Sequence, residues 1–132
     1  MSFDYSGFMH LYQRIDRLHR EFGAFLQRFL LKQALDALGK TKRITPVDTG
    51  YLQNTWMIGN IQREGEMLKI TIYNTTEYAA FIEYGHLTRD RMSWKRGYFM
   101  CTLSIKEVER RMPTRFRSEF ATFVAGLGME IR

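Results

Sequence analysis

The feature that most constrains the fold is an apolar stripe in the first third of the chain, where large apolar residues recur at alternating spacings of three and four positions. The stripe consists of Phe8, Leu11, Ile15, Leu18, Phe22, Phe25 and Phe29. This period places the residues on one side of an α-helix. Residues 1–43 are therefore assigned to one long helix that ends near Gly39, because glycine often follows a helix and cations favour its C-terminal end.

The same spacing occurs in coiled coils, but no regular charge pairing lies beside this stripe. Charge pairs at the flanking positions would normally set the partner of a coiled coil. We therefore favour a helix that lies on a sheet or on a neighbouring subunit.

A turn is expected directly after the long helix. Pro46 disfavours a helical conformation at the residue before it. Asp48 and Thr49 belong to the residue types that cap helix N-termini, and Gly50 suits a tight turn. We therefore expect a rigid turn that starts a short helix and leads the chain toward a sheet.

Residues 44–85 as a whole are expected to hold this turn, a hairpin and a short helix. Residues 56–63 and 67–73 predict two strands, since apolar and polar residues alternate in the second of them. The Glu-Gly-Glu sequence between them suits a hairpin loop. A Thr-Thr-Glu sequence then predicts a helix start, and this helix is expected to stop at Gly85, which permits positive φ.

Residues 86–97 are polar and basic without a clear period, and they predict a mobile loop. Apolar spacings of three and four predict helices over residues 98–132. Pro113 interrupts this pattern, so both a kink and two abutting helices remain open. Together the elements predict one α+β domain over residues 1–132, with a long N-terminal helix, a small antiparallel β-sheet with short helices, and a C-terminal helical region.

Composition limits the class of protein. The chain has 132 residues, of which 45% are hydrophobic and 26% are charged, which suits one globular domain. The single cysteine excludes an internal disulfide. No apolar run approaches the ~20 residues of a membrane span, and the first residues lack the pattern of a secretory signal. We therefore expect synthesis in a reducing cytoplasm and no membrane partner.

The net charge of +6 is unevenly distributed. Residues 1–45 carry +4, residues 46–85 carry −3, residues 86–97 carry +3 and residues 98–132 carry +2. A nucleic-acid-binding surface needs positive charges that converge on one face. Opposite charges in successive segments also favour head-to-tail self-association, in which a basic surface of one subunit meets an acidic surface of the next.

No catalytic pattern stands out, because the sequence contains no Gly-rich phosphate loop, zinc-protease motif or nucleophile-elbow motif. Asp48, Glu77, Glu83 and His86 are the only group that suggests a metal or acid–base site. Simpler explanations exist for the acidic residues, since Asp48 and Glu77 suit helix N-termini and Glu83 suits a solvated position or an ion pair. Cys101 fits a small buried apolar residue. We therefore expect no enzyme, no metal and no cofactor.

The segment 86–97 combines cations with an aromatic residue, and this mixture fits three interpretations. Arg91, Trp94, Lys95 and Arg96 would suit a surface for single-stranded nucleic acid or phosphate. They would also suit a protein interface, where tryptophan and arginine dominate binding, or a solvated loop that orders on assembly. We favour the interface with Trp94 as its anchor, because a large aromatic residue in a polar loop has no evident core to join.

Three blocks of sequence occur together in a known family. They are TPVDTGYL at residues 45–52, EYAAFIEYGH at residues 77–86 and GYFM at residues 97–100. In combination they make the chain similar to the minor tail component family of tailed bacteriophages and prophages, over essentially its whole length. The resemblance implies a structural virion protein, a neck or tail-completion protein that forms a ring at the head–tail junction or the head-proximal end of the tail.

The resemblance also implies partners and residue roles. The partners would be other copies in a homo-oligomeric ring, neighbouring head–tail connector or tail proteins, and, by non-specific contact, the DNA in the channel. The structural motif residues would be Pro46, Asp48, Thr49, Gly50, Glu77, Tyr78 and Gly85. The interface candidates would be Tyr84, His86, Arg91, Trp94, Lys95 and Arg96. The alternative function is a small basic nucleic-acid-binding accessory protein, and a small nuclease ranks last.

Overall fold

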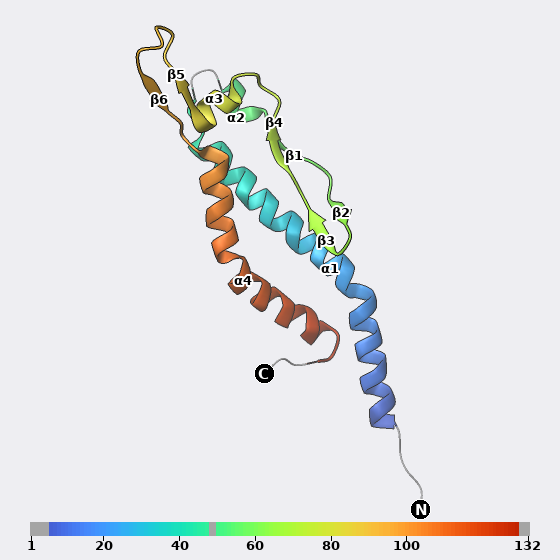
Figure 1. Ribbon diagram of the computed structural model, residues 1–132. Coiled ribbons are helices and arrows are strands. Elements are labelled where there is room, and N and C mark those ends of the chain that lie inside the picture. Colours follow the sequence, from blue (N-terminus) through green and yellow to red (C-terminus); the bar gives the residue numbers. More distant parts are fainter. Residues whose placement is uncertain (1–5, 48–49, 130–132) are drawn as a thin grey trace, which may run out of the picture. The chain divides into compact units, whose positions relative to one another are not determined.

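The computed structural model describes residues 6–47 and 50–129 (Figure 1). Its two long helices are α1 (Ser6–Ile44) and α4 (Met100–Gly126). Between them the chain forms two short helices and three antiparallel strand pairs. The expected α+β class is therefore confirmed. Within the described ranges, no helix has both the length and the apolar character that a bilayer crossing requires.

The chain divides into two compact units. The terminal unit comprises residues 1–29 and 113–132, and the central unit comprises residues 30–112. Both long helices contribute to both units, and the expectation of one domain over the whole chain stays a prediction. α4 continues through Pro113 as one helix, so of the two alternatives left open, two abutting helices are wrong.

The core of the terminal unit is a stack of phenyl rings. The rings come from Phe22, Phe25 and Phe29 of α1 and from Phe116, Phe120 and Phe123 of α4. Phe25 stacks on Phe123 with ring centroids 4.6 Å apart, and Phe29 meets Phe116 edge-on at 5.4 Å. This part of the stripe is thus covered by α4 of the same chain, and the expected sheet or neighbouring subunit is wrong for it.

α1 continues beyond Gly39, so the expected helix end there is wrong. Thr41 and Thr45 are buried, and their hydroxyls donate to carbonyls one turn back, to Ala37 at 2.8 Å and to Thr41 at 2.6 Å. Packing and hydrogen bonding here offset the ~1 kcal/mol that a glycine costs inside a helix. The helix ends just before the Thr45–Pro46 pair, where proline disfavours further helix.

The core of the central unit combines residues from four elements. Leu52 of α2 (Tyr51–Asn54), Trp56 of β1 (Trp56–Ile58), Ala79 of α3 (Ala79–Tyr84) and Met100 of α4 are buried together. The indole Nε1 of Trp56 donates to the hydroxyl oxygen of Thr45 at 3.0 Å, so the polar atom of this large buried ring is satisfied.

A β-ribbon follows α2 and covers part of this core. β1 pairs with β4 (Ile72–Asn74), and β2 (Gln62–Glu64) pairs with β3 (Met67–Lys69) across a turn where Gly65 has φ +60°. Leu68, Ile70 and Ile72 are half-buried, whereas the residues between them are exposed. The predicted alternation is confirmed, although each of the two expected strands is broken into two shorter ones.

β5 (Gly85–Leu87) and β6 (Trp94–Arg96) form the third antiparallel pair. The expectation that residues 86–97 lack regular structure is therefore wrong, because the segment is a β-hairpin. The mobility predicted for it stays a prediction.

Candidate functional site

The six interface candidates lie on or directly beside the β5–β6 hairpin. The opposed pairs are Leu87 with Trp94, His86 with Lys95 and Gly85 with Arg96. Tyr84 is the last residue of α3, just before β5, and Arg91 lies in the turn with φ +60°. Because side chains alternate along a strand, Trp94 and Arg96 lie on one side of the hairpin and Lys95 on the other.

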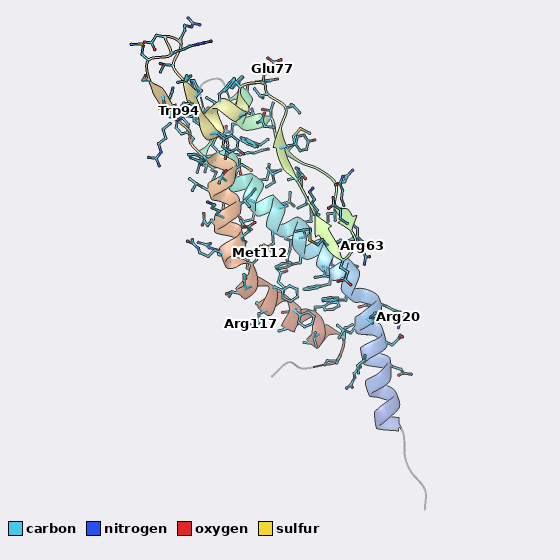
Figure 2. The ribbon with its side chains drawn as sticks, in the orientation of Figure 1. Arg20, Arg63, Glu77, Trp94, Met112 and Arg117 are labelled. Atoms are coloured by element: carbon cyan, nitrogen blue, oxygen red, sulfur yellow. The ribbon has the colours of Figure 1, made fainter. Side chains whose placement is uncertain are left out.

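The hairpin exposes large apolar side chains. Trp94 on β6 is 61% exposed, Leu87 opposite it is 54% exposed and Met92 in the turn is 84% exposed (Figure 2). The cations of β6 are exposed beside them. Trp94 therefore does not belong to the core of the central unit, and the hairpin presents a surface that is both apolar and basic.

The turn of the hairpin is held by Asp90. Its Oδ1 atom accepts from the hydroxyl of Thr88 at 2.6 Å and from the backbone N–H of Met92 at 3.0 Å. These hydrogen bonds lower the pKa of Asp90, because both favour the charged carboxylate. A further hydrogen bond, from the N–H of Thr88 to the carbonyl of Ser93 at 2.9 Å, closes the turn.

The base of the hairpin depends on two glycines. Gly85 has φ +94°, so the expected positive-φ turn is confirmed. A Cβ atom on Gly97 would overlap the backbone of Glu83, Tyr84 and Gly85, so the two ends of the hairpin approach more closely than any other residue allows. The backbone N–H of Phe99 donates to the carbonyl of Glu83 at 2.9 Å and completes this joint.

Glu83 is the residue that sequence analysis misjudged most clearly. It is only 4% exposed, and its carboxylate binds the N-terminus of α4. Oε2 accepts from the N–H of Cys101 at 3.0 Å, and Oε1 accepts from the N–H of Thr102 at 2.9 Å and from its hydroxyl at 2.8 Å. The expected solvated position is therefore wrong. Its spacing of four from Ala79 was the available signal, because that spacing puts both on the buried face of α3.

Other titratable groups offer little chemistry. Burial, together with the nearby carboxylate of Glu83, raises the pKa of the half-buried Cys101 thiol, which makes it a weak nucleophile. The Nδ1 atom of His86 is buried without a hydrogen-bond partner in the described part of the chain, and its ring meets Phe81 edge-on at 6.0 Å. Residues 6–47 and 50–129 contain no cluster of three His, Cys, Asp or Glu side chains that could hold a metal ion.

The turn after α1 is only partly described. Gly50 is the N-cap of α2, with φ +79°, and among the described residues no side-chain capping bond is made at this position. Asp48 and Thr49, the expected caps, lie outside the described residues. Pro46 follows Thr45, the first residue beyond the end of α1, which agrees with the expected effect of a proline on the residue before it.

The start of α3 differs from the prediction. Tyr78 is its N-cap residue and makes no side-chain capping bond, and Glu77 is exposed. Asn74 orders this segment instead, because its Oδ1 atom accepts from the N–H of Thr76 at 2.8 Å and its Nδ2 atom donates to the carbonyl of Leu52 at 3.1 Å. Asparagine thus supplies the turn that the Thr-Thr-Glu sequence was expected to supply.

Comparison with known families identifies a family that the chain resembles. The model of a family described as "Bacteriophage HK97-gp10, putative tail-component" matches residues 10–85, which is more than half of the chain. The match runs from α1 to the first residue of β5. No curated protein matches the chain, and no solved structure matches it either.

Proposed function

Since the chain belongs to the HK97-gp10 family of bacteriophage tail components, we propose that its copies form a ring at the head–tail junction or the head-proximal end of the tail. As a tail component, the chain is a structural part of the virion and contacts other tail or head–tail proteins. Within this proposal it acts as a neck or tail-completion protein.

The observation that carries the ring is the exposed β5–β6 hairpin. A two-stranded hairpin alone is marginally stable in water, and this one exposes Leu87, Met92 and Trp94 instead of burying them. Clustered exposed apolar residues mark interaction surfaces, and tryptophan with arginine dominates the energy of protein interfaces. The hairpin therefore supports self-association or docking on a neighbouring tail protein, with Trp94 as the anchor.

The proposal includes no catalysis and only weak contact with DNA. A net charge of +6 attracts DNA without sequence preference, and such binding weakens steeply as salt rises. We expect DNA affinity of this kind only, and no hydrolysis of nucleic acid or protein. Sequence-specific binding that persists at high salt would instead favour a nucleic-acid-binding accessory protein.

Position in the particle is the direct test. Antibody or gold labelling of particles that contain the chain should mark the head-proximal end of the tail, and native mass spectrometry of the material released from that region should detect oligomers. Label on the capsid surface or at the distal tail tip would contradict the proposal.

The role of Trp94 is tested by three alanine variants. Trp94→Ala should leave the free energy of unfolding within ~0.5 kcal/mol of the parent value, as for most surface changes. The same variant should abolish joining of heads to tails. Met67→Ala removes an equally exposed apolar side chain outside the hairpin and should leave joining intact. Trp56→Ala should lower the free energy of unfolding by ~3–5 kcal/mol, as expected for a buried tryptophan. A similar loss in Trp94→Ala would place Trp94 in a core and refute the interface.

A further inference from the structure

The central unit contains a groove that begins at the free edge of β4. Two cavities of about 370 Å³ and 200 Å³ adjoin, because Ile72 of β4 and Ile105 of α4 line both. The strand segment 70–74 and α4 line both cavities. The wider cavity is also lined by α3, and the narrower one by α1 through Leu30 and Ala34. These two cavities are called the edge groove below.

Backbone N–H and C=O groups of β4 face this groove without a partner strand in the described part of the chain. The N–H of Gly59 donates to the carbonyl of Thr71 at 2.9 Å, which fixes the phase of the β1–β4 ladder. Backbone groups alternate in direction along an antiparallel strand, so the N–H and C=O of Ile72 point to the edge away from β1. In the described part of the chain, no strand pairs with that edge. Ile72, Tyr73 and Asn74 all line the wider cavity despite their alternating side chains, which indicates that the strand borders the cavity along its edge.

The groove and the β5–β6 hairpin are complementary in charge and polarity. Glu83 and Glu109 are the charged residues that line the two cavities, and no lysine or arginine lines either of them. Glu83 is buried and its carboxylate is bound to the first turn of α4, so the exposed Glu109 is the carboxylate open to an approaching cation. The rest of the lining is mostly apolar. The hairpin carries four cations against one carboxylate, together with exposed Trp94 and Leu87. β6 also has one unpaired edge among the described strands, because it pairs only with β5.

We propose that the β5–β6 hairpin of one copy docks in the edge groove of the next, with one of its strands added to the free edge of β4. This inference rests on the proposed ring and names the two surfaces that join its subunits. The contact is heterologous, since it joins different surfaces of the two copies, and repetition of such a contact generates a ring when the rotation closes. Backbone hydrogen bonds would give affinity, and alternate side chains of the docked strand would enter the groove.

Disulfide trapping between full-length chains tests this arrangement. Cys101 is the only cysteine, so a Cys101→Ala background leaves none. One chain carries Tyr73→Cys, and its isotopically labelled partner carries Trp94→Cys, Lys95→Cys or Arg96→Cys. A docked β6 predicts cross-linked yields that alternate along the strand, with positions 94 and 96 alike and position 95 different by several-fold. A docked β5 predicts instead that the yields at positions 86 and 87 differ by several-fold.

A control and a blocking variant complete the test. Met67→Cys replaces Tyr73→Cys at an exposed position away from the groove and should give low yields without alternation. Ala80→Trp fills the wider cavity from an exposed position on α3 and should abolish cross-linking at unchanged thermal stability. Ala121→Trp, at an exposed position of α4 in the terminal unit, should leave cross-linking intact.

The outcomes separate this inference from the proposed function. Three outcomes would overturn the docking, even if label still marks the head-proximal tail end. They are equal cross-linking yields at all positions, yields no higher than with Met67→Cys, and cross-links that survive Ala80→Trp. An absence of cross-links at high concentration and in assembled particles would overturn it as well. Alternating yields together with label elsewhere in the particle would support the docking and refute the proposed position.

Discussion

Removal of the Glu83 carboxylate should destabilise the central unit, because this carboxylate holds the first turn of α4. The carboxylate accepts three hydrogen bonds, from the N–H groups of Cys101 and Thr102 and from the hydroxyl of Thr102, at 2.8 to 3.0 Å. These N–H groups belong to the first turn of α4, where no carbonyl of the same helix can accept from them. Glu83→Ala therefore leaves donors unpaired at a buried site.

The magnitude follows from the number and type of these bonds. A hydrogen bond to a charged group contributes ~1.5–3 kcal/mol, and bonds that share one acceptor group do not add fully. The attraction between a carboxylate and the positive end of the helix dipole contributes ~0.3–2 kcal/mol more. We expect Glu83→Ala to lower the free energy of unfolding by about 3–5 kcal/mol, as for removal of one partner from a buried charged contact. Glu83→Gln keeps the volume and one acceptor oxygen and should lose about half as much.

Urea unfolding followed by tryptophan fluorescence measures the loss. A Trp94→Phe background leaves Trp56 as the single tryptophan, which reports on the central unit. The midpoint should fall while the m-value stays constant. Glu66→Ala, at an exposed position in the turn between β2 and β3, is the matched control and should stay within ~0.5 kcal/mol. A loss in Glu83→Ala no larger than in this control would refute the capping role.

Two further predictions concern backbone space and pH. Gly97→Ala should lower the free energy of unfolding by at least ~2 kcal/mol, because the backbone must move to admit the Cβ atom. Gly23→Ala, which has free space inside α1, should raise it by ~0.5–1 kcal/mol. Equal urea midpoints for the two variants would contradict this prediction. The Lys40 ammonium, 2.8 Å from Glu107, lowers the pKa of that carboxyl, so its stabilising effect is complete above the ordinary carboxyl pKa and is lost as pH falls through the lowered value. The midpoint difference between the parent and Glu107→Gln should therefore shrink toward acid pH, and a difference that grows there would disprove the assignment.

The elements predicted best are those whose apolar residues recur at a regular spacing. The stripe that includes Phe22, Phe25 and Phe29 repeats over many turns, and the alternation from Leu68 to Ile72 matches a half-buried strand. In both cases the pattern is local and records which side faces the core. The end of α1 was missed at Gly39 because burial of residues far from it in sequence decides whether the helix continues.

For the candidate site, the sequence named residues but not the hairpin that carries them, and their role in an interface stays a prediction. The segment of Trp94, Lys95 and Arg96 has no alternation, so it contains no strand signal, and its pairing depends on the close approach of Gly85 to Gly97. A charged residue is usually exposed, so the sequence alone favours a solvated position or an ion pair for Glu83. Its burial depends on the amides of α4, which lie close to it only after folding. Contacts of this kind carry no periodic signal in the sequence.

In the proposed ring, each subunit contacts one neighbour through its β5–β6 hairpin and the other through its edge groove. Glu83 connects these two surfaces within a subunit. Its backbone carbonyl holds Phe99 at the base of the hairpin at 2.9 Å, its carboxylate holds the first turn of α4, and its side chain lines the wider cavity of the edge groove. Gly97 closes the same joint with no space for a side chain. The hairpin and the groove are therefore held in one fixed relation within the central unit. A heterologous contact closes into a ring only when each copy turns the next by the same angle. A rigid joint at Glu83 supplies that constancy, whereas a flexible one would allow open chains of subunits.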